Sequence, residues 1–163
     1  MNSNLEKLLI IDFGSQFTQL IGRKLRELNV FSEIIPYQNV SNKTLENYNP
    51  KAVILSGGPS SVVGKKFPLP PSNLFDLGIP VLGICYGLQV MMKLLGGKVD
   101  SGSGTSEFGR AILKKTDSNS KIINDLFING KEQVWMSHGD HVSGLSKGFE
   151  AIASSEGAPF AII

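Results

Sequence analysis

Three short, continuous apolar runs constrain the fold of this 163-residue chain more than any other feature. They are Leu8–Ile11, Ala52–Leu55 and Val81–Ile84, and none of them alternates with polar residues. A strand that reads as a continuous apolar run is buried on both faces, which is typical of a parallel sheet covered by helices. Each run is followed by a turn that contains glycine. The runs therefore predict parallel strands whose carboxyl ends lead into tight turns.

Apolar residues at helical spacing lie between and after these runs. One stripe occupies Phe17–Leu28 with charged residues between its members, and a second occupies Leu88–Leu95. Such spacing places the apolar residues on one face of a helix. Ser15 is expected to cap the first helix and Gly96-Gly97 to end the second. With a further strand expected at Phe31–Ile35, the rhythm predicts a doubly wound α/β sheet, which binds ligands at the carboxyl ends of its strands.

The second half of the chain is less regular and predicts a few antiparallel strands. Phe108–Leu113 and Glu132–Met136 form one expected pair, and Gly148–Ala153 and Phe160–Ile163 form a late pair. The predicted fold is therefore an α/β, mostly parallel sheet with antiparallel additions. Because the chain ends on an apolar, strand-like stretch without a polar tail, we expect it to be truncated.

Composition narrows the class of protein and its compartment. A net charge of +2 without any long Lys/Arg run argues against nucleic acid as a partner. The longest apolar runs are strand-sized, which argues against a membrane span, and Met1–Lys7 lacks the features of a signal peptide. A single cysteine excludes a disulfide within the chain. A lone free thiol fits a cytoplasmic location.

The segment Gly83-Ile84-Cys85-Tyr86-Gly87 carries the strongest chemical signal. It follows a predicted strand, opens a predicted helix and matches the nucleophile-elbow pattern with cysteine in place of serine. The glycines permit a sharp turn that exposes the sulfur, and a helix N-terminus favours the reactive thiolate. The alternative is that Cys85 is a small buried apolar residue. The strand before it and the helix after it favour the nucleophile.

The neighbouring turn, Ser56-Gly57-Gly58-Pro59, is the candidate for an oxyanion hole. Its backbone N–H groups, together with that of Tyr86, would stabilise a tetrahedral intermediate formed at Cys85. The alternatives are a plain Gly-Pro turn or a weak phosphate cradle. The glycine and lysine spacing of a phosphate-binding loop is absent from the sequence.

A cysteine nucleophile also needs a general base, which is normally histidine. The sequence has two histidines, His138 and His141. Each is a candidate base, and the alternative for each is a histidine at the surface or in the lining of a pocket.

Together these segments resemble the class I glutamine amidotransferases, and among them the amidotransferase domain of the GMP synthetase family. The resemblance extends from Leu9 to Ile162. It is carried by four separated motifs in the same order, with Glu107-Phe108-Gly109 in addition: Ile11–Ile21, Leu55–Val62, Gly83–Gln89 and Val134–Asp140. It implies a flavodoxin-like fold and a single glutamine amidotransferase domain over residues 1–163.

The resemblance implies a mechanism and a set of site residues. Cys85 would attack the side-chain amide of glutamine, and the N–H groups of Gly58 and Tyr86 would hold the oxyanion. Ammonia would then leave as a thioester forms, and water would release glutamate from it. The ammonia would serve the amination of XMP to GMP in purine nucleotide biosynthesis. The residues aligned with the glutamine-binding positions are Gly57, Ser60, Gln89, Ser137, His138, Gly139 and Asp140.

The sequence also departs from the family pattern. The family's base lies in a His-Pro-Glu segment that this sequence does not contain, and His138 matches a pocket-lining position. The synthetase domain, which would be the partner and would use ATP and Mg²⁺, is also absent. No metal or cofactor is expected in the amidotransferase domain itself. We therefore expect little glutaminase activity from this chain alone.

Two alternatives remain at this stage. The chain could be a separate glutaminase subunit that uses His138 or His141 as its base and works with a separate synthetase. It could instead be a non-enzymatic protein in which the cysteine elbow serves binding or redox sensing. Four charged or polar residues near the motifs are candidates for an interdomain face, but each is expected to be a solvated surface residue: Asp12, Gln16, Glu107 and Arg110.

Overall fold

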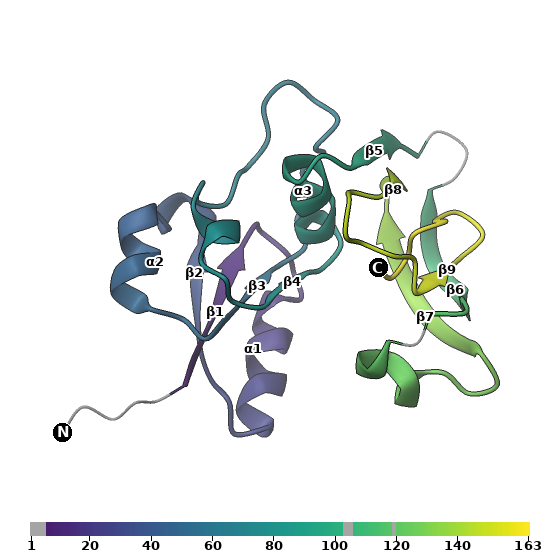
Figure 1. Ribbon diagram of the computed structural model, residues 1–163, viewed down its shortest axis with the longest axis horizontal. Coiled ribbons are helices and arrows are strands. Elements are labelled where there is room, and N and C mark those ends of the chain that lie inside the picture. The colour runs from purple at the N-terminus through teal and green to yellow at the C-terminus, as the bar shows by residue number, and fades with distance from the viewer. Residues whose placement is uncertain (1–5, 103–105, 119) are drawn as a thin grey trace. The chain divides into compact units, whose positions relative to one another are not determined.

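The computed structural model describes residues 6–102, 106–118 and 120–163. The chain divides into two compact units, each described by itself below (Figure 1). The first unit comprises Met1–Ser60 and Lys66–Val90, and the second comprises Ser61–Lys65 and Met91–Ile163.

The first unit is built on a four-stranded parallel sheet. Its strands are β1 (Lys7–Asp12), β2 (Phe31–Pro36), β3 (Ala52–Leu55) and β4 (Val81–Gly83), in the order β2-β1-β3-β4. All three pairings are parallel, which confirms the predicted sheet. Apolar residues of β1 and β3 are almost completely buried, as expected for strands with neighbours on both sides and helices on the faces.

Strand β4 differs from the prediction that its apolar run is buried on both faces. Leu82 is 56% exposed, because β4 is an edge strand of this sheet and pairs only with β3 among the described residues.

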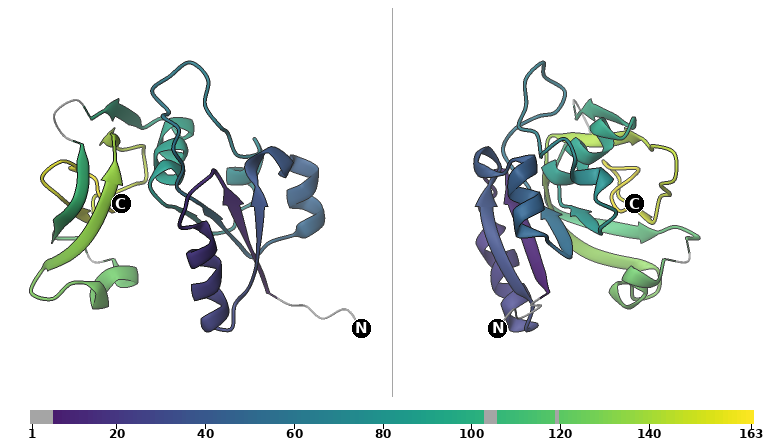
Figure 2. Two further views of the ribbon diagram at one scale, coloured as in Figure 1. Left: turned by 180° about the vertical axis from the view of Figure 1, so that it is seen from behind. Right: turned by 60° about the vertical axis from the view of Figure 1, so that its left-hand side comes forward.

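Helices run alongside this sheet, as the two views of Figure 2 show. They are α1 (Thr18–Glu27), α2 (Asn42–Tyr48) and α3 (Tyr86–Leu94), and short 3₁₀ turns occupy Tyr37–Asn39 and Leu74–Asp76. Helix α1 contacts β1 and β2.

Of the two predicted helix ends, the start of α1 is wrong in its cap and the end of α3 is confirmed. The expected cap by Ser15 is wrong: Phe17 is the N-cap residue and makes no capping hydrogen bond through its side chain. The Ser15 hydroxyl instead accepts a hydrogen bond from the N–H of Phe17, within the turn that precedes the helix. The prediction that α3 ends before Gly96-Gly97 is confirmed, because Gly96 has a φ of +91° and Gly97 N–H donates to Met92 O.

The second unit contains two small antiparallel sheets. Strands β5 (Lys98–Ser101) and β8 (Asp140–Gly144) form one of them, and the other has the order β7-β6-β9. Its members are β6 (Glu107–Lys115), β7 (Lys131–His138) and β9 (Ala153–Ser154), and a 3₁₀ turn occupies Lys121–Leu126. The predicted antiparallel pairing of the 108–113 and 132–136 segments is confirmed.

The predicted late strand pair is wrong in its extent. Of the 148–153 segment only Ala153 belongs to a strand, and Ala153 and Ile162 form an isolated bridge. The carbonyls of Ala151 and Ile152 are occupied instead by Thr116, whose hydroxyl donates to Ala151 O at 2.7 Å and whose N–H donates to Ile152 O at 2.9 Å. The pairing with the C-terminal stretch is made at Ile162, whose carbonyl accepts from Ile152 N–H and Ala153 N–H and whose N–H donates to Ala153 O.

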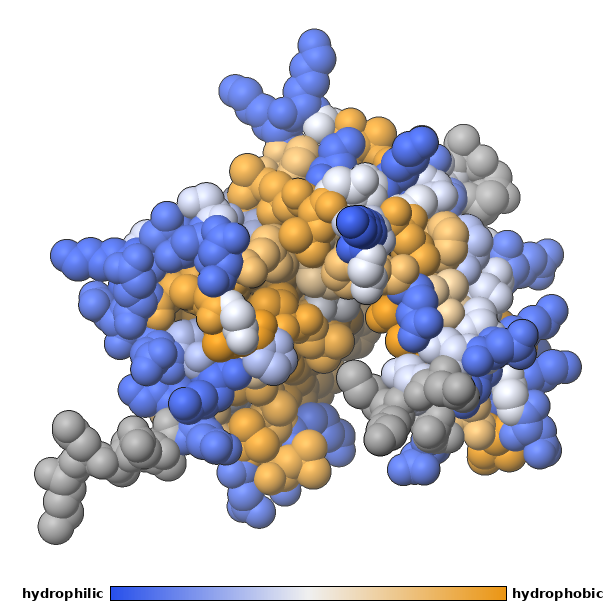
Figure 3. All heavy atoms as spheres, in the orientation of Figure 1, coloured by the Kyte–Doolittle hydropathy of each residue, from blue (hydrophilic) through white to orange (hydrophobic). Residues whose placement is uncertain are grey.

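Both apolar and hydrophilic residues lie on the face shown in Figure 3. The large apolar side chains that are most exposed are Leu28, Phe108, Ile128 and Trp135. Among the helices of the described residues, none combines the length and the apolar character needed to cross a membrane.

Candidate active site

Cys85 lies in the tight turn between β4 and α3, in the first unit. Its φ of +51° places it in the left-handed region, which is uncommon for a residue with a side chain and costs of order 1–2 kcal/mol. The N–H of Gly87 donates to Ile84 O at 2.9 Å, and the N–H of Gln89 donates to Cys85 O at 3.0 Å. The Cys85 side chain is exposed. This is the geometry of a nucleophile elbow, in which backbone strain presents the sulfur to a substrate.

The two glycines of the elbow are required by close backbone contacts. A Cβ on Gly83 would lie 2.7 Å from the N and Cα atoms of Leu88, at the start of α3. A Cβ on Gly87 would lie 2.2 Å from the carbonyl oxygen of Leu55, in β3. Each glycine therefore lets the first turn of α3 approach a neighbouring backbone more closely than any side chain permits.

Tyr86 anchors the start of α3 inside the first unit. Tyr86 is completely buried, and the centroids of the Tyr86 and Phe13 rings lie 5.1 Å apart. Its hydroxyl donates a hydrogen bond to the carbonyl of Pro68. Burial, followed by the proximity of Tyr37, raises the pKa of Tyr86 well above its ordinary value, so the hydroxyl remains a donor.

The Ser56–Pro59 turn lies beside the elbow, as the sequence predicts. A Cβ on Gly57 would lie 3.6 Å from the Cβ of Cys85 and 3.5 Å from the Oγ of Ser15. A Cβ on Gly58 would lie 2.5 Å from the carbonyl oxygen of Phe13. The backbone of this turn therefore approaches both Cys85 and the β1–α1 turn. Donors to an oxyanion formed at Cys85 would have to lie beside its sulfur, as this turn does.

The carboxylate of Asp12 organises these turns and was not found by sequence reasoning. Its Oδ1 accepts hydrogen bonds from Gly14 N at 2.9 Å and Thr18 Oγ1 at 2.7 Å. The hydroxyl of Ser56 lies 3.3 Å from the same oxygen, and Ser56 Oγ accepts from Phe13 N at 2.9 Å. Asp12 is half-buried, and its oxygen is bound within the β1–α1 turn, whereas the Ser56 hydroxyl has a shorter contact to Gly57 O at 2.8 Å.

The second group of predicted residues, Ser137–Asp140, lies in the second unit. Ser137 and His138 end β7, Asp140 begins β8, and Gly139 is the single residue between the strands. The side chain of His138 is only 9% exposed, and its Nε2 lies 3.0 Å from Glu107 Oε2. His138 is therefore held by a carboxylate within its own unit.

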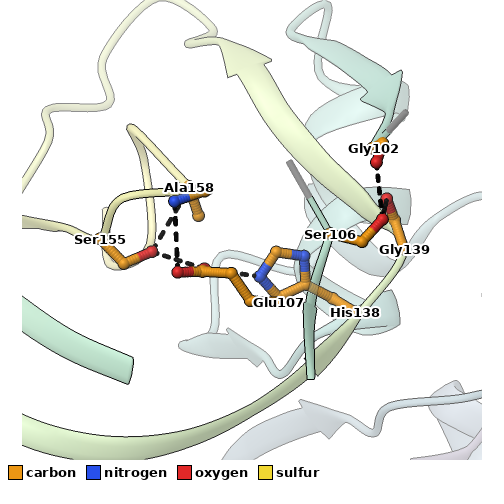
Figure 4. A network of polar contacts seen from close by, with 8 residues as sticks. Gly102, Ser106, Glu107, His138, Gly139, Ser155 and Ala158 are labelled. Atoms are coloured by element: carbon orange, nitrogen blue, oxygen red, sulfur yellow. Dashed lines mark hydrogen bonds and ion pairs between the residues drawn. The ribbon is translucent and has the colours of Figure 1, made fainter. Parts of the chain in front are cut away.

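Glu107 is the centre of a polar network in the second unit (Figure 4). Besides His138, its carboxylate accepts hydrogen bonds from Ser155 Oγ at 2.6 Å and from Gly157 N at 3.2 Å. Its side chain is 15% exposed, so the expectation of a solvated surface residue is wrong for Glu107. Burial alone would raise the pKa of Glu107, but the hydrogen bonds from Ser155, Gly157 and His138 outweigh it and lower the pKa below its usual value.

The remaining predicted residues occupy defined positions in the first unit. Gln89 is buried in α3, one turn after Cys85, and Ser60 follows the Gly57–Pro59 turn. The first unit thus brings together Cys85, Gly57, Gly58, Tyr86 and Gln89, and the second unit holds Ser137–Asp140 as one short segment. Within the part of the chain that the structure describes, no group of three or more His, Cys, Asp or Glu side chains is placed to hold a metal ion.

Comparisons with known proteins agree with this arrangement. The chain is 60% identical over 157 residues to the GMP synthase [glutamine-hydrolyzing] of Cereibacter sphaeroides, which covers 96% of this chain and 30% of the relative. It is 54% identical over 159 residues to the enzyme of the same name from Phenylobacterium zucineum, covering 97% and 30%. The chain thus spans about a third of the length of these curated relatives.

Solved structures show the same fold. A protein of Thermoplasma acidophilum, assigned provisionally as one subunit of a GMP synthase, superposes with a TM-score of 0.79 at 27% identity, covering 98% of this chain and 77% of that one. A glutamine amidotransferase of Thermotoga maritima superposes with a TM-score of 0.74 at 21% identity, covering 94% and 69%. The family model for glutamine amidotransferase class-I matches residues 9–163. With a matching elbow, fold and family model, the chain belongs to the class I glutamine amidotransferases.

Proposed function

We propose that this chain is the glutamine-hydrolysing part of a GMP synthase, and that Cys85 is its nucleophile. The observation that carries the proposal is the exposed, left-handed Cys85 at the start of α3, beside the Gly57–Gly58 turn. The similarity to GMP synthases supports the choice among amidotransferases. Because the chain spans about 30% of those relatives, the amination of XMP is the proposed role of a synthetase domain or subunit that uses ATP and Mg²⁺.

The proposed reaction proceeds in two steps. In the first, the Cys85 thiolate forms a bond to the amide carbon of the glutamine side chain, and the carbonyl oxygen becomes an oxyanion. The N–H groups of Gly58 and Tyr86 are the proposed donors to this oxygen. A general acid gives a proton to the amide nitrogen, and collapse of the intermediate breaks the carbon–nitrogen bond, releases ammonia and leaves a thioester on Cys85. In the second step water attacks the thioester, and glutamate and the thiol are released.

The remaining site residues are proposed to hold the glutamine rather than to react. Asp140 suits the α-ammonium group because it carries a negative charge, and the backbone of Ser137 and Gly139 suits the α-carboxylate. Gln89 and Ser60 are the proposed partners from the first unit. A reduced thiol is required at Cys85, which favours the cytoplasm as the location.

The proton transfers are expected to limit this chain when it is assayed alone. Of the two histidines in its sequence, His138 is occupied by Glu107 at 3.0 Å and matches no base position in the family. A missing general base typically costs about 10²–10⁴-fold in rate. We therefore propose that the 163-residue chain binds glutamine but turns it over slowly. A large loss of turnover in His138→Ala or in His141→Ala would instead assign the base to that histidine and favour a separate glutaminase subunit.

The test is mass spectrometry after treatment with a glutamine-mimicking electrophile, with iodoacetamide in parallel. Cys85 is the only cysteine, so every thiol adduct reports on this site. Labelling by the mimic that excess L-glutamine blocks, and that D-glutamine does not block, supports the proposal. Labelling by iodoacetamide alone would contradict it and would favour a binding or redox role for the elbow.

A further inference from the structure

We propose that Glu107 is a positioning residue for glutamine, which fixes the segment Ser137–Asp140 through the imidazole of His138. This inference rests on the proposed function, because it concerns the segment proposed to bind the α-amino and α-carboxylate groups. It assigns a role to a residue that belongs to neither the elbow nor that segment.

The first support is that the Glu107 carboxylate joins three separate parts of the second unit. Glu107 begins β6, His138 ends β7, and Ser155 and Gly157 belong to the loop that follows β9. Figure 4 shows the carboxylate between the His138 ring and the loop that carries Ser155. The loop is closed on itself, because Ala158 N donates to Ser155 Oγ at 3.1 Å. One carboxylate therefore ties the end of β7 to two other segments.

The second support is that the His138 ring has no other polar anchor in the part of the chain that the structure describes. An ionised carboxylate can accept hydrogen bonds but cannot donate them, so the contact at Oε2 requires a proton on His138 Nε2. The other ring nitrogen, Nδ1, is buried and has no hydrogen-bond partner among the described residues. Removing the carboxylate would therefore leave both nitrogens of a ring that is 9% exposed without a partner, and the ring would be free to turn.

The third support is that Gly102 and Ser106 already restrict the space around the backbone of Gly139. A Cβ on Gly102 would lie 1.9 Å from the carbonyl oxygen of Gly139, and the Ser106 hydroxyl donates to Gly102 O at 2.6 Å. The carbonyl of Gly139 thus packs closely against Gly102 and lies 3.4 Å from the Ser106 hydroxyl, and the neighbouring His138 is held by Glu107. Loss of the Glu107 contact would release one end of the segment while leaving the strands paired.

A carboxylate suits this position better than an amide. Its Oε2 accepts from both Ser155 Oγ and His138 Nε2, and its Oε1 accepts from Gly157 N. Glutamine has the same size but only one acceptor oxygen, so its NH₂ group would face a donor on one side. A glutamine that turned its oxygen to the Oε2 position would, however, keep the His138 contact and lose only Gly157. Glu107→Met, which has a similar length and no side-chain oxygen, is therefore the variant that removes the His138 contact.

The experiment measures how much L-glutamine is needed to protect Cys85 from iodoacetamide in the 163-residue chain. We expect Glu107→Met to raise that concentration at least about tenfold, which corresponds to about 1.4 kcal/mol. The iodoacetamide rate without glutamine should change less than about twofold, because Cys85 lies in the other unit. The matched control is Glu150→Met: Glu150 also accepts from a serine, Ser118 Oγ at 3.0 Å, but is exposed. In this control, L-glutamine should protect Cys85 at the wild-type concentration.

A second variant keeps the test decisive if Glu107→Met does not fold. Glu107→Asp keeps the charge but shortens the side chain by one carbon, so its carboxylate cannot reach His138, Ser155 and Gly157 together, and protection should weaken severalfold. Wild-type protection in Glu107→Met, or in Glu107→Asp if that is the only folded variant, would overturn the positioning role and leave the proposed function standing. Failure of L-glutamine to protect the wild-type chain would overturn the proposed function, and this inference with it.

Discussion

Replacing Gly87 with alanine would place a methyl group against the backbone of β3. The added Cβ would lie 2.2 Å from the carbonyl oxygen of Leu55 and 2.7 Å from its carbonyl carbon. Real Cβ atoms essentially never come closer than 3.0 Å to such atoms, so the helix or the strand must retreat by at least 0.8 Å. Neither can move easily, because Leu55 is completely buried and pairs with both β1 and β4.

The energetic cost follows from these contacts. Overpacking in a well-packed core costs typically about 1–3 kcal/mol, and the upper end applies where the obstacle is backbone instead of a flexible side chain. For a chain of this length each kcal/mol lowers the melting temperature by about 2–4 °C. Because alanine also gains about 1 kcal/mol of helix propensity in α3, we expect a net cost of about 2 kcal/mol and a melting temperature about 4–8 °C below the wild type for Gly87→Ala.

The assay combines a thermal melt with the rate of Cys85 alkylation. Moving the first turn of α3 should also change the exposure of the sulfur, so the alkylation rate at 25 °C should change severalfold. The matched control is Gly22→Ala in α1, where the nearest atom to the added Cβ is the flexible Cδ1 of Ile34 at 3.1 Å. There the gain in helix propensity of about 1 kcal/mol offsets mild crowding, and little change is expected. A Gly87→Ala chain that melts and alkylates like the wild type would refute the argument.

Three further predictions concern single side chains. Cys85→Gly should raise the melting temperature by about 1–3 °C, because glycine adopts the φ of +51° without strain; an unchanged or lower value in a calorimetric melt would contradict the stored strain. Tyr86→Phe should cost about 1 kcal/mol in a urea titration, because the Pro68 carbonyl loses its donor, while alkylation of Cys85 stays unchanged. Folding lowers the pKa of Glu107 below its ordinary value of 4.5, so its carboxylate should stabilise the folded chain fully above pH 4.5. This stability should be lost as the pH falls through the lowered pKa, and Glu107→Gln should flatten the pH dependence in melts from pH 7 to 3.

The parallel sheet and the elbow could be predicted because their signals are local. An apolar run, a glycine-containing turn and an apolar stripe at helical spacing all lie within about twenty residues of one another along the chain. Burial of the runs was predicted correctly for β1 and β3, each of which has a paired strand on both sides. It was wrong for Leu82, because nothing in a short run says whether the strand lies at an edge.

The polar networks could not be predicted because their partners are distant in sequence. Asp12 meets Ser56 across 44 positions, and Glu107 meets Ser155 and Gly157 across 48 and 50 positions. An isolated acidic residue is ordinarily a surface residue, and no local pattern marks the exceptions. The extent of the late strand pair could not be predicted either, since the apolar character of residues 160–163 does not reveal that the pairing with Ala153 is a single bridge at Ile162.

The contact between Gly87 and Leu55 also ties the shape of the elbow to the sheet. The turn at Cys85 is held against β3 by a hydrogen bond from Ile84 N–H to Leu55 O at 3.0 Å, and β3 pairs with β1, whose residues lie more than forty positions earlier. Such non-local pairing forms slowly compared with a helix or a hairpin. A nascent or misfolded chain therefore carries an ordinary thiol, and the nucleophile acquires its shape only in a molecule whose sheet has assembled.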